Sequence, residues 1–155
     1  METLKDNELT QQIIAQIESL IGNDKKLAVP PKVFRDMQGQ FIAYDQGKSL
    51  RAAFPVLERY EGPTGVMQGG MIAAAFDNVC GPLSYLLTSS YCITVNLNTS
   101  FVRPITRQDG ELIVEIGLVD RTKQFLLLDG KAVNPQGKLI APSTSQWFVV
   151  TPPSR

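Results

Sequence analysis

The chain has 155 residues, of which 43% are hydrophobic and 19% charged, a composition typical of one globular domain with a full core. Fifteen basic residues balance fifteen acidic ones, and no run of Lys or Arg offers a surface for phosphates, which argues against nucleic-acid binding. Residues 1–6 lack the apolar segment of a signal peptide, and no apolar run approaches membrane-spanning length. We therefore expect one cytoplasmic domain over residues 1–155 that has no membrane partner.

The chain contains no histidine, which excludes Ser-His-Asp and Cys-His catalytic sites and a His-ligated zinc ion. Its two cysteines, Cys80 and Cys92, lie in apolar segments, as is typical of buried thiols in a reducing compartment. With no other soft ligands, a metal site is not expected. Hydrolytic chemistry must then come from carboxylates, hydroxyls, amides and the backbone.

The first predicted element is an amphipathic helix over residues 3–21, followed by a connector over residues 23–33. Its apolar residues recur at helical spacing, and polar residues fill the opposite face. These apolar residues are Leu4, Leu9, Ile13, Ile14, Ile17, Leu20 and Ile21. Gly22-Asn23 is a usual pair at the end of a helix. We expect the core of the domain to begin at residue 34.

A β-hairpin is predicted next. The turn Asp45-Gln46-Gly47-Lys48 separates a strand over residues 41–44 from an extended segment over residues 49–59.

The segment that starts at Gly70 predicts a buried helix, because apolar side chains occur on every side of it. Asp77 lies within this segment, where a charge is costly unless it is paired, hydrogen-bonded or used. Gln68 and Gly69 precede the helix, whose N-terminus offers free N–H groups and the positive end of the helix dipole to an oxyanion. A carboxylate and an oxyanion donor together indicate acyl chemistry.

Four strands are predicted after this helix. Residues 93–101 alternate apolar and polar side chains, which predicts a strand with one buried face. Further strands are expected over residues 112–118, 124–134 and 139–150. One apolar helix followed by a strand meander excludes a doubly wound fold and favours an antiparallel sheet of about five strands around the helix. The exposed edges of such a sheet predict at least a dimer.

These segments resemble the hotdog-fold acyl-CoA thioesterases of the phenylacetate-type (PaaI-like) group. That group has a polar residue, usually His, then Gly-Gly, an Asp or Glu in the central helix, and a short hydroxyl residue in the next strand. The matching residues here are Gln68, Gly69, Gly70, Asp77 and Thr94. Phe101-Val102-Arg103-Pro104 and Gly110-Glu111-Leu112 also resemble the group's strand end and following turn. The resemblance runs from residue 41 to residue 150. It implies an α+β hotdog fold, a curved antiparallel sheet wrapped around one long helix, here with an added N-terminal helix.

The resemblance also implies a role for each motif residue. Asp77 would be the nucleophile or the general base, the Gly69 N–H would polarise the thioester carbonyl, and Thr94 would hold water or substrate. Gln68 would take the place of the usual His. Further substrate contacts are expected from Gly70, Asn78, Arg103, Arg121 and Lys123, the last three near the CoA phosphates. No cofactor is implied beyond the CoA of the substrate. Each site would form between two subunits of a homodimer or homotetramer.

The predicted function is hydrolysis of a small or medium acyl-CoA or aryl-acyl-CoA. Gln68 cannot titrate, and an Asn that related enzymes carry shortly before the His is missing from residues 61–64. The alternative is therefore a non-catalytic hotdog module that binds acyl-CoA. A hotdog dehydratase is a third and poorer choice, because that chemistry generally needs a histidine.

Single residues keep structural alternatives as well. Asp77 could anchor a neighbouring loop, Gln68 could be a plain polar residue at the helix start, and Thr94 could be an ordinary strand residue. The group Leu83, Tyr85, Leu86 and Leu87 fits a core or a dimer interface better than an acyl pocket.

Overall fold

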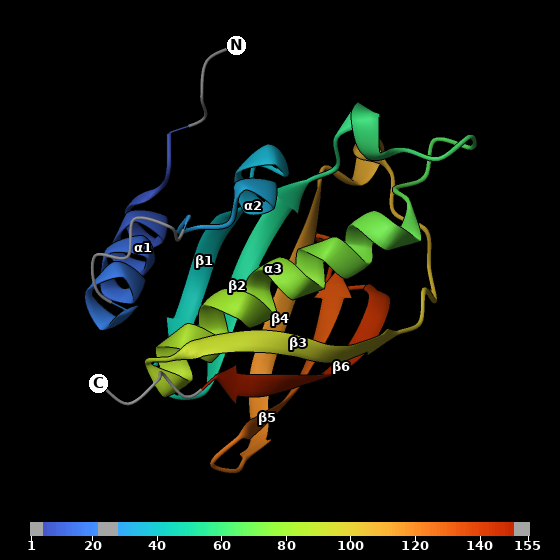
Figure 1. The fold of residues 1–155 in the computed structure, drawn as a ribbon. Helices are drawn as coiled ribbons and strands as arrows, with labels where there is room; N and C mark the ends of the chain where they lie inside the picture. The colour runs from blue at the N-terminus through green and yellow to red at the C-terminus, as the bar shows by residue number, and fades with distance from the viewer. Residues whose placement is uncertain (1–4, 22–27, 151–155) are drawn as a thin grey trace.

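The computed structural model describes residues 5–21 and 28–150, and it places one helix, α3, across a curved antiparallel sheet (Figure 1). The described strands number six, one for each predicted strand segment, in the order β1-β2-β4-β5-β6-β3. The elements of the core are β1 (Gln40–Asp45), β2 (Ser49–Pro55), α3 (Gly69–Thr88), β3 (Tyr91–Thr99), β4 (Glu111–Arg121), β5 (Phe125–Val133) and β6 (Leu139–Val150). This arrangement confirms the predicted hotdog fold class.

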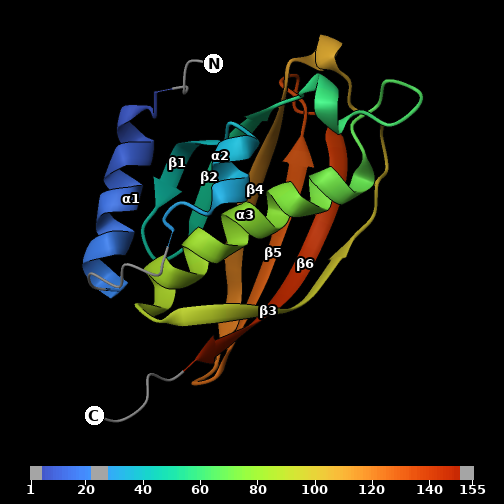
Figure 2. The ribbon, with the colours of Figure 1, turned by 45° about the horizontal axis from the view of Figure 1, so that its top comes forward.

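The N-terminal helix α1 spans Glu8–Ile21, so it begins five residues later than predicted. The Asn7 side chain explains the start, because its Oδ1 accepts the Thr10 N–H at 2.7 Å in the manner of an N-cap. The Thr10 hydroxyl in turn accepts the Phe41 N–H at 2.8 Å and ties α1 to β1. The two elements are neighbours in Figure 2. Residues 3–4 and the predicted helix end at 22–23 lie outside the described residues.

The predicted connector over residues 23–33 is wrong at its end, where a short helix, α2 (Lys32–Asp36), begins. Five residues are too few for a helical repeat to be seen in the sequence. Phe34 holds α2 on the core: its ring stacks on Phe41 at 4.7 Å and meets Phe54 edge-on at 5.5 Å.

The predicted hairpin is confirmed as β1 and β2, but the second strand is shorter than expected. It ends at Pro55, which cannot donate to a sheet, and a 3₁₀ turn, η1 (Glu58–Tyr60), follows. The later strands agree with prediction to within a few residues. No helix in the described parts of the chain is long and apolar enough to span a membrane.

The central helix is buried on one side only, which corrects the prediction of a helix enclosed all round. It begins at Gly69, one residue earlier than predicted. Phe76, Val79 and Leu83 are fully buried against the sheet. Ala74 and Asp77 lie on the other side and are only half-buried. Alanines on this second side made the helix look apolar all round in the sequence. In a single chain, no described strand or helix fully covers that side.

Strand β3 does not have the buried apolar face that its alternation predicted. Its exposed fractions are 59% at Ile93 and 52% at Val95. The strand lies at the edge of the sheet, a bulge interrupts its pairing between Thr94 and Asn96, and Ile93 pairs with Phe148, which is also exposed. The apolar residues of β3 therefore remain available to a partner.

Gly130 is expected to be essential to sheet packing. A Cβ built on it would lie 2.4 Å from both the Glu115 carbonyl oxygen and Ile116 Cδ1, so the backbone of β4 would have to move. Gly130→Ala should lower the free energy of unfolding by about 1–3 kcal/mol, measured by urea denaturation. Gly117→Ala is the matched control, since its nearest neighbour lies at 3.8 Å. Equal midpoints for the two variants would contradict the prediction.

Candidate active site

Asp77 lies half-buried in the middle of α3 and faces β3. The Thr94 hydroxyl donates a hydrogen bond of 2.9 Å to Asp77 Oδ1. Among the described residues, no backbone amide and no cation binds this carboxylate, so it does not anchor a loop. Thr94 orients one carboxylate oxygen, and the other has no hydrogen-bond donor among the described residues.

The start of α3 supplies the predicted hydrogen-bond donors. Gln68 is the N-cap residue, and its carbonyl accepts the N–H groups of Met71 at 2.9 Å and Ile72 at 3.2 Å. Gly69 and Gly70 are the first two helical residues, and within the described structure their N–H groups have no acceptor. An anionic oxygen at this end of the helix would meet free donors and a favourable dipole.

The Gln68 side chain is exposed and belongs to the preceding loop. Its amide nitrogen lies 3.4 Å from the Glu61 carbonyl oxygen, a weak donor contact, and makes no capping bond to the helix. The backbone N–H of Gln68 donates to the Tyr60 carbonyl at 2.9 Å. The side chain therefore points toward the loop over residues 61–66, and not toward Asp77.

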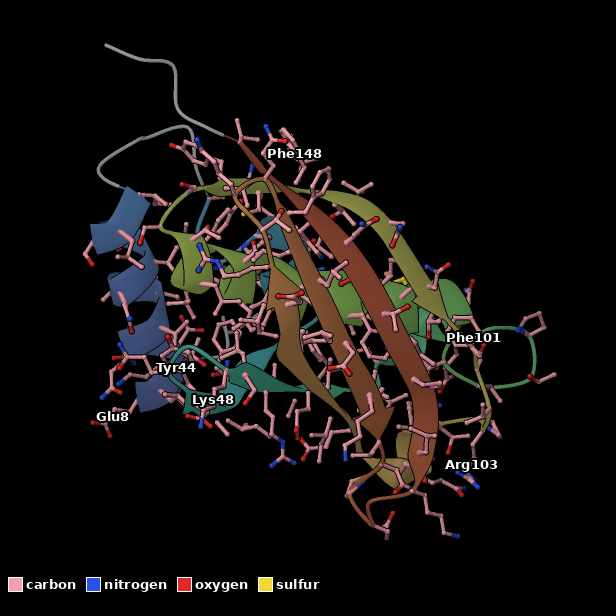
Figure 3. The ribbon with its side chains drawn as sticks, turned by 90° about the horizontal axis from the view of Figure 1, so that it is seen from below. Glu8, Tyr44, Lys48, Phe101, Arg103 and Phe148 are labelled. Carbon is pink, nitrogen blue, oxygen red and sulfur yellow. The ribbon has the colours of Figure 1, made fainter. Side chains whose placement is uncertain are left out.

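Phe101 covers the start of α3, a role that the sequence did not reveal. A Cβ built on Gly69 would lie 2.8 Å from the Phe101 ring, so only glycine lets the ring come this close. The adjoining groove has a volume of about 310 Å³ and is lined by Val66, Met67, Gly69, Ile72, Phe101, Val102, Arg103 and Pro104. Figure 3 shows Phe101 and Arg103 at the same end of the molecule. The sequence marked residues 101–104 as a strand end that resembles the family's and Arg103 as a phosphate contact, but it gave no sign that the Phe101 ring lies against Gly69.

The groove includes Gly69 but not Asp77. Eight residues of helix separate the two, which corresponds to about 12 Å along the axis. A carboxylate and an oxyanion donor must both lie about 3 Å from the reacting group. One copy of the chain therefore does not bring its own Gly69 and Asp77 to one substrate carbonyl.

The other predicted substrate contacts are scattered. Asn78 is buried, and its amide donates to the Ala74 carbonyl at 2.8 Å, within the helix. The Arg103 guanidinium donates to the Leu139 carbonyl beside the start of α3, whereas Arg121 donates at 2.8 Å to the carbonyl of Leu87 near the helix end. These two ends of α3 are about 27 Å apart.

Lys123 lies exposed in the turn between β4 and β5, near Arg121. The three predicted phosphate contacts therefore do not lie together: Arg103 is near the start of α3, whereas Arg121 and Lys123 are near its end.

Cys80, on the buried side of α3, contacts two polar groups of β6, the Ser145 hydroxyl and, through it, the Trp147 indole N–H. Burial raises the pKa of the Cys80 thiol to about 12, although a contact with the Ser145 hydroxyl at 3.6 Å opposes the shift. The Trp147 indole N–H donates to the same hydroxyl at 3.1 Å. A thiol held in its protonated form is a poor nucleophile, so Cys80 is a structural residue.

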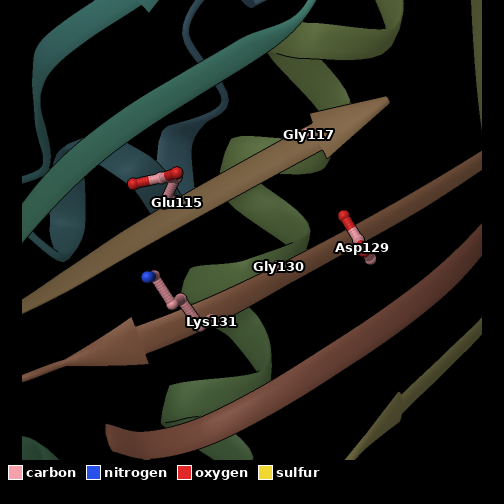
Figure 4. Close-up of a pocket in the computed structure, with 5 residues that line it drawn as sticks. All are labelled: Glu115, Gly117, Asp129, Gly130 and Lys131. Atoms are coloured by element: carbon pink, nitrogen blue, oxygen red, sulfur yellow. The ribbon is translucent and has the colours of Figure 1, made fainter. Parts of the chain in front are cut away.

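The other hollows lie elsewhere on the surface. One, of about 250 Å³, lies over Gly117 and Gly130 on the outer side of the sheet, between Glu115, Asp129 and Lys131 (Figure 4). Another, of about 520 Å³, is lined by residues 97–100 and 142–144. The described part of the chain contains no cluster of three or more Cys, Asp or Glu residues that could hold a metal ion.

Several known proteins with similar sequences or structures are named as thioesterases or esterases. The model of the Thioesterase superfamily matches residues 64–141. Ta0293 of Thermoplasma acidophilum, named as a candidate esterase, is 28% identical over 131 residues, which are 83% of this chain and 96% of that protein.

Two solved structures extend the comparison. A candidate thioesterase of Ralstonia eutropha, named as related to phenylacetic acid degradation, is 30% identical with a TM-score of 0.72, and the match covers 85% of this chain and 97% of the other. The Escherichia coli PaaI protein, from the phenylacetic acid degradation operon, has a TM-score of 0.73 at 16% identity, and the match covers 93% and 97% of the two chains. The sequence match spans the glycine pair, Asp77 and Thr94, and the chain belongs to the Thioesterase superfamily with its hotdog fold.

Proposed function

We propose that the protein is an acyl-CoA thioesterase whose site forms between two copies of the chain. The observation that carries the proposal is the arrangement along α3. Among the described residues of this member of the Thioesterase superfamily, a half-buried carboxylate is bound by Thr94 alone, and the N–H groups at the start of the same helix have no acceptor. Substrate, mechanism and assembly are each part of the proposal.

The separation of Gly69 and Asp77 supports a site built from two subunits. A second copy that pairs with the free edge of β3 would extend the sheet and cover Ile93 and Val95. A two-fold axis near Thr94 would then bring the Asp77 of one copy toward the Gly69 of the other.

The proposed reaction uses these groups in a defined order. The thioester carbonyl oxygen accepts the Gly69 N–H, which stabilises the negative charge that develops there. The Asp77 carboxylate attacks the carbonyl carbon, or removes a proton from a water that attacks it. When water is the nucleophile, the C–S bond breaks, CoA leaves as the thiolate, the acyl group leaves as the carboxylic acid, and the proton held by Asp77 passes to the thiolate or to solvent. When Asp77 is the nucleophile, loss of the CoA thiolate leaves a mixed anhydride on Asp77. A water then cleaves the bond between the acyl carbon and the Asp77 oxygen, which gives the carboxylic acid and restores the Asp77 carboxylate, with one proton of that water passing to the thiolate or to solvent. Thr94 keeps the carboxylate oriented throughout.

Asp77→Asn is expected to lower thioester turnover by orders of magnitude, because it keeps size and the Thr94 hydrogen bond but removes negative charge and basicity. The measurement is thiol release from a panel of short acyl-CoAs, with melting temperature recorded in parallel. Asp129→Asn is the matched control, because it removes a carboxylate from the outer side of the sheet. A parent that binds acyl-CoA and releases no thiol would establish the binding module instead.

Gly69→Pro tests the oxyanion donor. Proline lacks the N–H, is favoured at the first helical position, and suits the extended backbone of Gln68 (φ −62°, ψ 139°). The kcat should fall by about 10²–10³-fold. Gly69→Ala is the control, because its Cβ meets the Phe101 ring but its N–H remains. Similar losses in both variants would assign the effect to crowding and contradict the donor role.

The protein is expected to be at least a dimer by light scattering at micromolar concentration.

Mixing Asp77→Asn with Gly69→Pro after unfolding and refolding should restore about a quarter of parental activity, because half of the dimers are mixed and each contains one intact site. A monomeric mass, or no recovery from a mixture that does form mixed dimers, would overturn the shared site.

A further inference from the structure

The C-terminal half of α3 carries an aromatic pair that the proposed reaction does not use. The half-buried ring of Tyr85 meets the ring of Tyr91 edge-on, with centroids 6.5 Å apart and an interplanar angle of 87°. Tyr91 is the first residue of β3. The pair is therefore a second link between the helix and the strand that the bond between Asp77 and Thr94 already joins.

The two links are separated by a similar distance along α3 and along β3. Tyr85 follows Asp77 by eight residues of helix, about 12 Å. Tyr91 precedes Thr94 by three residues of strand, about 10 Å. The helix and the strand therefore run antiparallel and side by side, and Figure 1 shows β3 alongside this half of α3.

The helix surface between the links carries no side chain at Gly81. A Cβ built there would have only Trp147 Cη2 within 4 Å, at 3.8 Å. The Trp147 indole is buried below this position. On the face of α3 that carries Asp77 and Tyr85, Gly81 therefore leaves a gap between the two side chains, with the Trp147 indole beside it and two aromatic rings at its far end.

The two directions away from Asp77 differ in character. Toward the helix start, Gly70 and Arg103 are exposed and the groove opens to solvent. Toward the helix end, burial is the main cause that raises the pKa of Tyr85, followed by its neighbours Cys92 and Tyr91 and last by Asp77. The side that ends in the rings of Tyr85 and Tyr91 suits an acyl group, and the side that opens to solvent beside Arg103 suits the CoA portion.

We propose that Tyr85 determines specificity by limiting the length of the acyl group. This inference rests on the proposed thioesterase function. The acyl group starts at Asp77, lies over Gly81, and ends against the rings of Tyr85 and Tyr91. Short and medium acyl groups fit within about 12 Å of helix, and long ones do not.

The test compares kcat/KM for butanoyl-CoA, octanoyl-CoA and tetradecanoyl-CoA. The parent should accept the first two and reject the third. Tyr85→Ala should raise the ratio of tetradecanoyl to butanoyl by about 10- to 100-fold, since each buried methylene contributes to discrimination. Tyr85→Phe, which keeps the ring, should retain the parental ratio. Gly81→Leu places a side chain in the path and should reduce octanoyl turnover more than butanoyl turnover.

Leu86→Ala is the matched control, because it removes similar volume from the next residue of the same helix. A selectivity unchanged by both Tyr85→Ala and Gly81→Leu would overturn the proposal. A second outcome would also overturn it. If Tyr85→Ala lost the dimer or lowered the melting temperature, and Gly81→Leu left the ratio of octanoyl to butanoyl turnover unaltered, Tyr85 would be an interface or packing residue. Gly81→Leu also decides the case in which Tyr85→Ala does not fold.

Failure of the proposed function would be seen separately, as absence of thiol release from every substrate by the parent. The same variants would then be titrated with the three acyl-CoAs. A shift of binding preference toward tetradecanoyl-CoA in Tyr85→Ala would still support the length limit. Binding that does not depend on chain length, or no binding, would overturn it.

Discussion

The hydrogen bond between Thr94 and Asp77 joins the central helix to β3, whose other edge is unpaired in the described parts of the chain, and the rest of the candidate site depends on that placement. It holds the carboxylate against the edge strand of the sheet, on the half-buried side of α3. Because α3 is a continuous helix, the carboxylate also has a set distance of about 12 Å from the free N–H of Gly69. A second copy of the chain is the simplest way to shorten that distance without breaking the helix.

Most of the fold could be predicted because its elements are long and strongly patterned. The hairpin turn at residues 45–48 and the meander after the central helix both appeared where expected. The helix α2 could not be predicted, since its five residues owe their conformation to the packing of Phe34 against two other phenylalanines. Tertiary contact decided that segment, and local pattern carried no signal for it.

The errors at β3 and at Asp77 share one physical origin. Apolar periodicity shows which side chains avoid water, but it does not show whether the chain itself or a partner covers them. Ile93 and Val95 look like core residues in the sequence, yet they are exposed on the edge of a single chain. The half-buried side of α3 was likewise taken for core. Both features lie where the proposed second subunit would bind.

Within the candidate site, the motif residues were accessible to sequence reasoning because each has a local requirement. Gly69 must be small because the Phe101 ring lies against it, and Thr94 must carry a hydroxyl to reach the carboxylate. The basic residues had no such requirement. Arg103 and Arg121 were grouped by charge alone, and the fold places them at opposite ends of α3.

The absence of histidine is consistent with thioester chemistry in particular. Hydrolysis of an amide or an alkyl ester releases a strongly basic group, so a general acid such as imidazolium usually assists its departure. A thiol has a reference pKa of about 8.5, so a thiolate leaves without that help. A site with one carboxylate and backbone donors can therefore cleave a thioester, whereas an unactivated ester or amide would lack its proton donor. On this argument Gln68 needs only to hold the loop before α3, and its inability to titrate costs the proposed reaction little.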